Sequence, residues 1–212
     1  MTPVSRRAFA AAGLALLVAG CGKREAEQQG PISRREGVTG AQGSGPEGSP
    51  PVVADVSRGL GRSVPVRLSI PAVGVDTPVM RLGLAADGTA EVPPLAADDR
   101  AGWYRYSPTP GEVGPAVILG HVTVGQYGDG VFRHLARLRR GEVIVVRRKD
   151  GTSATFAVHA VRTVARADFP VEDVYGDVGR PELRLITCGG PRTGDEYRDN
   201  VIVFAGLSST AS

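Results

Sequence analysis

Aromatic residues make up only 5% of the sequence, with a single Trp, so the core must rest on Val, Leu, Ile and Ala. Cysteine is equally scarce. Two cysteines allow at most one disulfide, and Cys21 and Cys188 lie in such different settings that we expect none. The 29 glycines and 16 prolines supply many turns between short elements, which favours an all-β domain.

A strong charge of one sign is also missing. The formal net charge is +3, and the first 20 residues hold Arg6 and Arg7 with no acidic residue, so removing them leaves +1. A nearly neutral chain has no electrostatic support for binding nucleic acid.

No apolar run reaches the roughly 20 residues that span a bilayer as a helix. The run from Ala10 to Ala19 is shorter, follows the twin arginines, and ends in the small residues before Cys21. Residues 1–20 are therefore predicted to be an export signal. They resemble a bacterial lipoprotein signal, in which the Cys is lipidated and becomes the mature N-terminus, and the arginine pair resembles the twin-arginine signal.

An ordinary secretory peptide with an incidental Cys21 is the alternative to lipidation. If Cys21 is acylated, Cys188 is the only free thiol of the chain. Residues 21–62 are polar and low in complexity, with few large apolar side chains to bury, and we expect a disordered tether.

The remaining residues, 63–208, are enough for one domain. Their β-rich runs recur between turn signals, as expected for a sandwich or barrel. The runs are Val66–Ile70, Ala116–Leu119, Val143–Val146, Ala154–Val164, Leu183–Thr187 and Val201–Ala205. The spacing of Phe132, Leu135 and Leu138 predicts one short helix.

Cys188 ends a strand-like run and precedes Gly189 and Gly190, so a substrate backbone could approach its thiol. Taken alone, a lone Cys is more often a buried structural residue than a nucleophile. Both interpretations remain open on this local pattern.

His121 ends another apolar run just after a glycine, and its imidazole could act as acid and base beside a thiol. The other histidines, His134 and His159, are weaker candidates. Arg198 precedes the last predicted strand and suits an oxyanion-binding role, with Arg192 as a competitor in the same loop.

Together these segments resemble the sortases, cysteine transpeptidases of Gram-positive cell surfaces, and among them the actinobacterial class F group. The resemblance covers roughly residues 64–207. The motifs that carry it are Ile70-Pro71-Ala72-Val73-Gly74-Val75-Asp76, Gly102-Trp103-Tyr104, Ser107-Pro108-Thr109-Pro110-Gly111, Leu119-Gly120-His121, Leu183-Arg184-Leu185-Ile186-Thr187-Cys188-Gly189-Gly190 and Asp199-Asn200.

The resemblance implies a closed eight-stranded β-barrel with short helices. It implies His121 as acid and base, Cys188 as nucleophile and Arg198 as transition-state stabiliser, although the arginine of other sortase classes aligns nearer Asn200. It also implies surface proteins with a Leu-Pro-x-Thr-Gly-like sorting motif as donors, and a cell-wall precursor or pilin amine as acceptor. This chemistry needs no metal and no organic cofactor, and it belongs on the outer face of the membrane of a Gram-positive cell.

The sequence departs from the family in three respects. An Asp expected soon after His121 is missing, the loop from Pro191 to Gly194 is short, and the predicted lipid anchor differs from the transmembrane segment usual in the family. Two alternatives follow. A lipid-anchored module that binds peptide or wall without turnover would keep Cys188 buried. A cysteine L,D-transpeptidase would carry a His-Gly pair close before its Cys, whereas 67 positions separate His121 from Cys188.

Overall fold

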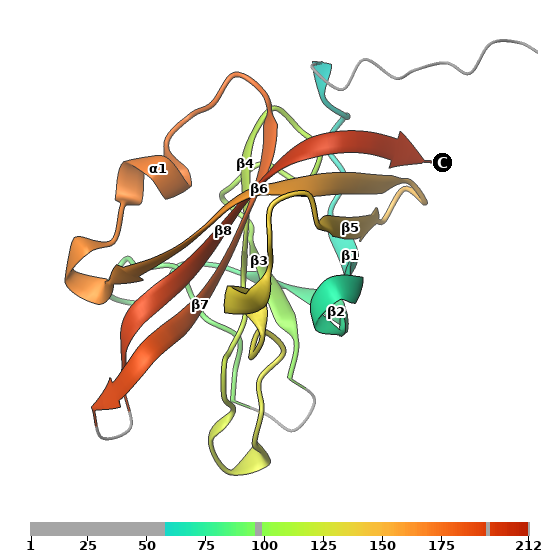
Figure 1. Ribbon diagram of the computed structural model, residues 1–212. Coiled ribbons are helices and arrows are strands. Elements are labelled where there is room, and N and C mark those ends of the chain that lie inside the picture. Colours follow the sequence, from blue (N-terminus) through green and yellow to red (C-terminus); the bar gives the residue numbers. More distant parts are fainter. Residues whose placement is uncertain (1–57, 96–98, 194–195, 212) are drawn as a thin grey trace, which may run out of the picture. The chain divides into compact units, whose positions relative to one another are not determined.

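The computed structural model describes residues 58–95, 99–193 and 196–211, and this part of the chain is built mainly of strands (Figure 1). The strands are β1 (Pro65–Ile70), β2 (Val75–Leu82), β3 (Ala101–Tyr104), β4 (Gly114–Leu119), β5 (Val143–Arg148), β6 (Ser153–Ala165), β7 (Pro181–Thr193) and β8 (Glu196–Ala211). The helical turns are η2 (Pro71–Val73), η3 (Gly125–Tyr127), η4 (Leu135–Arg137), η5 (Arg166–Asp168) and α1 (Val171–Tyr175).

The strands close into a barrel in the order β1-β2-β3-β4-β7-β8-β6-β5. Two neighbouring pairs are parallel, β2 with β3 and β4 with β7, and the others are antiparallel. The parallel pair β4–β7 matters most for function, because it joins two segments far apart in the sequence. The prediction of a closed eight-stranded barrel with short helices is confirmed.

Alternating side chains divide the strands between two apolar layers. The inner layer fills the barrel around Trp103, Phe132 and Phe156, which are fully or almost fully buried. The outer layer covers the outside of β4, β7 and β8 with Val117, Leu119, Val174, Ile186, Ile202 and Phe204. Val174 comes from α1, so this helix lies on the outer face of the sheet beside β4. The outer layer is the one that leads to the candidate site.

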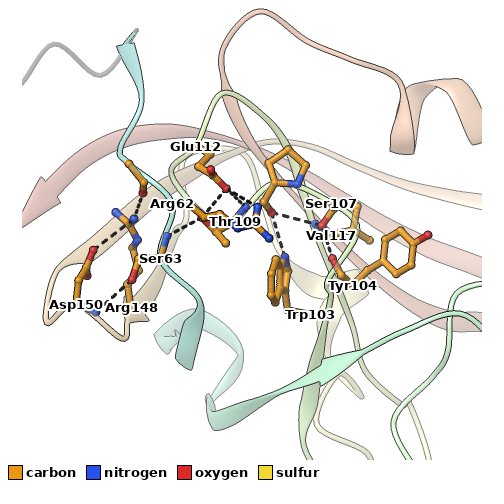
Figure 2. Close-up of polar contacts among 12 residues, drawn as sticks. Arg62, Ser63, Trp103, Tyr104, Ser107, Thr109, Glu112, Val117, Arg148 and Asp150 are labelled. Atoms are coloured by element: carbon orange, nitrogen blue, oxygen red, sulfur yellow. Dashed lines mark hydrogen bonds and ion pairs between the residues drawn. The ribbon is translucent and has the colours of Figure 1, made fainter.

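Two of the motifs that suggested the family form a polar network beside Trp103 (Figure 2). The indole Nε1 donates to the Pro108 carbonyl at 3.0 Å. The Ser107 hydroxyl donates to the Tyr104 carbonyl at 2.7 Å and accepts from the Val117 amide at 3.0 Å. These motif residues therefore hold the β3–β4 turn against strand β4, and their role here is structural.

All six predicted strands are present. Strands β2 and β3 were not predicted, because β2 contains Pro78 and β3 has only four residues, too few for a periodic pattern. The predicted helix is the single 3₁₀ turn η4. The export signal, Cys21 and the tether up to residue 57 lie outside the described residues.

Candidate functional site

The candidate residues lie just beyond the outer apolar layer, toward the ends of strands β4, β7 and β8. In β7 and β8, Ile186 pairs with Ile202 and, one step further along the outer face, Cys188 pairs with Asn200. In β4 the outer-face position Leu119 is followed two residues later by His121. The outer apolar layer thus forms the base on which the thiol and the imidazole are presented.

Parallel pairing brings the end of β4, which leads to His121, beside the strand that carries Cys188. Leu119 is the register partner of Ile186, and the Gly120 amide extends the ladder by donating to the Ile186 carbonyl at 3.1 Å. Strand β4 ends at Leu119, two residues before His121, and continuing the register by two residues would set His121 opposite Cys188. Adjacent strands are about 4.8 Å apart, so β4 delivers the backbone close to the β7 segment that ends in Cys188.

The His121 imidazole is half-buried and bonded to the β2–β3 connection, since its Nε2 lies 2.6 Å from the Pro93 carbonyl oxygen. A carbonyl only accepts, so Nε2 carries the proton and Nδ1 is the nitrogen left for proton exchange. The backbone of His121 is held from behind, because its carbonyl accepts from the Phe132 amide at 2.8 Å. This role of Pro93 was not predictable from the sequence, because every residue has a backbone carbonyl.

Cys188 is a free and exposed thiol. Its C-terminal neighbours leave no room for side chains: a Cβ on Gly189 would lie 2.6 Å from Val201, and one on Gly190 would lie 2.0 Å from an oxygen of Asp199. Gly190 also has a φ of +72°. The two glycines therefore let β8 pack closely against the strand that carries the thiol. The exposure of the Cys188 thiol is what a nucleophile needs. It argues against the buried structural cysteine that the local sequence pattern also allowed.

Arg198 is exposed and lies two residues before Asn200 in β8, on the same face in strand alternation. It lines a hollow of about 870 Å³ at the outer end of the β7–β8 hairpin. The other lining residues are Ala165, Arg166, Ala167, Pro191, Tyr197 and Asp199. Arg198 thus lies beside the thiol region and faces a hollow large enough for part of a peptide. Arg192 pairs with Tyr197 through its backbone, and its side chain lies outside the described part.

The remaining histidines lie away from this region. His134 precedes η4, and His159 on β6 is 4.0 Å from a carboxylate oxygen of Glu182. Burial and three nearby arginines lower the pKa of His159, and they outweigh the opposing effect of Glu182.

Metal-binding clusters of three or more His, Cys, Asp or Glu side chains are absent from residues 58–95, 99–193 and 196–211. In the same ranges, no helix is long and apolar enough to cross a membrane.

Comparisons with known proteins agree with this architecture. The model of the sortase domain matches residues 68–208. The SrtA sortase from Actinomyces oris has 26% identity and a TM-score of 0.52, with 76% of this chain and 87% of that chain covered. A Sortase D5 transpeptidase from Clostridium perfringens has 19% identity and a TM-score of 0.51, covering 69% and 79%. A lid mutant of sortase A from Corynebacterium diphtheriae has 18% identity and a TM-score of 0.53, covering 71% and 73%.

None of the curated protein sequences compared matches the chain. The sortase-domain match nevertheless spans well over half of the sequence, and its limits enclose His121, Cys188 and Arg198. The chain belongs to the sortase family, whose members are cysteine transpeptidases.

Proposed function

We propose that this protein cleaves a Leu-Pro-x-Thr-Gly-like sorting motif and transfers the new carboxyl end to an amine, with Cys188 as nucleophile and His121 as acid and base. The observation that supports the proposal is the parallel pairing of β4 with β7, because His121 follows the end of β4 and the exposed thiol of Cys188 lies two residues beyond the last paired residue of β7. Catalytic hydrogen bonds are often long before substrate binds, so the two side chains need not touch beforehand.

In the first step the Cys188 thiolate attacks the threonine carbonyl, and the carbon–nitrogen bond to the following glycine breaks. His121 gives its proton to the departing amine, and a thioester to Cys188 remains. In the second step an incoming amine attacks the thioester, His121 accepts its proton, and the thiolate leaves. Water takes the place of the amine when no acceptor is bound, so hydrolysis competes with transfer.

Arg198 is proposed to stabilise the negative charge that forms on the threonine carbonyl oxygen. Support comes from its position two residues along β8 from the register partner of Cys188, and from the permanent charge of guanidinium. Comparing Arg198→Ala with Arg192→Ala separates the two arginines: the variant of the catalytic arginine should lose acylation, and the other should retain it.

Incubating residues 58–212 with a library of Leu-Pro-x-Thr-Gly-like peptides and an amine tests the proposal. We expect cleavage and transfer that Cys188→Ala abolishes. If no peptide is cleaved, or if Cys188→Ala is as active as the parent, the transpeptidase proposal fails. Iodoacetamide adds a simple discriminator, because a non-catalytic binding module would keep an unreactive Cys188.

We also assign the chain to class F within the family, on the motifs from Ile70 to Asp76 and from Leu183 to Gly190. The acceptor is proposed to be a peptidoglycan precursor or a pilin amine. Lipidation at Cys21 would hold the enzyme on the outer face of the membrane of a Gram-positive cell. Metabolic labelling with a fatty acid tests the anchor, and a Cys21→Ala protein that still takes up the label would contradict it.

A further inference from the structure

Asn200 is the register partner of the nucleophile. In the antiparallel pairing of β7 and β8, Cys188 lies directly opposite Asn200, whereas Arg198 is displaced by two residues along β8. Directly opposite residues on one face have Cβ atoms about 5 Å apart, and the diagonal neighbours about 7–8 Å. The side chain of Asn200 is therefore the nearest one across the strand from the attacking sulfur.

The surroundings of Asn200 are apolar on three sides. On its other flank it pairs with Val164 of β6, and the next positions along the outer face are Ile202 and Ile186. All three belong to the outer apolar layer or pack against it. A hydrogen-bond donor over such a floor acts in a lower dielectric than in water, which strengthens its interaction with a developing charge.

A structural role does not account for an asparagine here. Asparagine is disfavoured in strands, and β8 is paired on both sides at this position. Within the described ranges the half-buried Asn200 side chain makes no hydrogen bond, whereas its neighbour Asp199 lies against Gly190. Its amide therefore has two donors with no protein partner, next to the thiol.

We propose that Asn200 is a further catalytic residue, whose side-chain amide donates a hydrogen bond to the threonine carbonyl oxygen as Cys188 attacks it. No proton is transferred, and the amide offsets the negative charge on that oxygen in both steps. This assignment rests on the proposed function. Arg198 has a longer, charged side chain and approaches the same oxygen from its diagonal position two residues along β8. The two side chains therefore act together.

The test compares Asn200→Ala and the near-isosteric Asn200→Asp with the parent protein. The control is Ser209→Ala, farther along the same strand β8, whose exposed side chain does not line the hollow and whose loss should leave kcat at the parent value. Steady-state kinetics with a cleaved motif peptide give kcat and KM, iodoacetamide gives the reactivity of Cys188, and thermal unfolding reports on the fold.

We expect kcat to fall roughly 100-fold in Asn200→Ala, as for the loss of one oxyanion donor, with KM and the iodoacetamide rate unchanged. In Asn200→Asp, kcat should fall further, because a carboxylate repels the negatively charged oxygen. Unchanged kcat, a raised KM with normal kcat, or an Asn200→Asp variant as active as the parent would overturn the assignment alone. A parent that cleaves no peptide would overturn the proposed function and this assignment together.

Discussion

The position of His121 requires a glycine at residue 130, because a side chain there would collide with His121. A Cβ on Gly130 would lie 2.3 Å from the His121 carbonyl oxygen and 2.9 Å from the His121 Cβ. The Gly130 amide also donates to the Val122 carbonyl at 2.8 Å, which closes the loop that follows the histidine. Backbone atoms cannot yield as a flexible side chain does, so any larger residue must displace His121 itself.

Gly130→Ala should therefore impair catalysis more than folding. We expect kcat to fall roughly 10- to 100-fold, because a displacement of about 1 Å can cost that much. The free energy of unfolding should fall by about 1–3 kcal/mol. Peptide cleavage and urea unfolding measure the two effects. Gly206→Ala is the matched control, since a Cβ there meets nothing within 4 Å, and equal losses in both variants would contradict the explanation.

His159 should make stability depend on pH. Burial is the main cause that lowers its pKa, which means that the folded protein binds its proton less readily than the unfolded chain. Stability is then fully present above the unfolded pKa of about 6.5 and falls as the unfolded chain takes up a proton at lower pH.

We expect the free energy of unfolding to decrease between about pH 7 and pH 5, and His159→Gln to flatten that slope. Urea unfolding across this range measures it. His134 also has a lowered pKa, through desolvation and two arginines, so some slope should remain in His159→Gln. A slope that steepens in the variant would mean that Glu182, and not burial, controls the histidine.

At the scale of elements, the long strand β7 carries both Cys188, the proposed nucleophile, and a buried ion pair. Arg184 lies 2.5 Å from Glu182, and both side chains are almost fully buried. The guanidinium also donates to the Asp173 carbonyl of α1 at 3.1 Å and stacks 4.6 Å from the centre of the Phe204 ring. Arg184 thus joins α1 to the outer face of the sheet, four residues before Cys188 along β7.

Arg184→Met should lower the free energy of unfolding by about 3 kcal/mol, because the buried Glu182 carboxylate then keeps only the exposed Arg180 as a cationic partner. Arg162→Met is the control. Arg162 also contacts Asp173 and Phe204, but half of its side chain is exposed, so its loss should cost less than about 1 kcal/mol. Urea unfolding measures both, and equal losses would show that burial of the pair is unimportant.

The strands and helices also show which elements could be predicted from sequence patterns. The long strands β6, β7 and β8 were predictable because each contains a long β-rich run. The run Phe132, Leu135 and Leu138 has a spacing of three, which is the period of a 3₁₀ helix, and the structure has η4 there. Helix α1 has only five residues, and local propensity carries little information over so short a segment.

At the scale of the whole molecule, the site depends on pairing between distant segments. His121 and Cys188 were predicted as partners through family resemblance, since no local pattern links residues 67 positions apart. The parallel β4–β7 register brings together the strands that lead to these two residues. Asn200 and Pro93 follow only from the strand register and from a backbone carbonyl, which a sequence pattern does not show.

The residues that precede β1 make polar contacts with two turns of the barrel, among them that of Ser63 with Thr109 (Figure 2). Arg148, whose side chain is almost fully buried, donates to the Gly61 carbonyl and lies 3.5 Å from Asp150. The Ser63 amide donates to the Thr109 hydroxyl at 3.1 Å. The Leu60 amide donates to the Gly111 carbonyl at 2.6 Å. Residues 60–63 thus supply partners to groups on two separate turns of the barrel.

A fragment that starts at Val64 should therefore be less stable than one that starts at Arg58, by about 2–4 kcal/mol, because a buried guanidinium loses a hydrogen-bond partner. Urea unfolding of the two fragments measures the difference. Arg62→Ala in the longer fragment is the control: its contact with Glu112 is 3.5 Å long and 61% of the Arg62 side chain is exposed, so little stability should be lost. Equal stability of the two fragments would mean that the barrel is complete from β1 onward, and that residues 58–63 serve only to connect it to the segment before them.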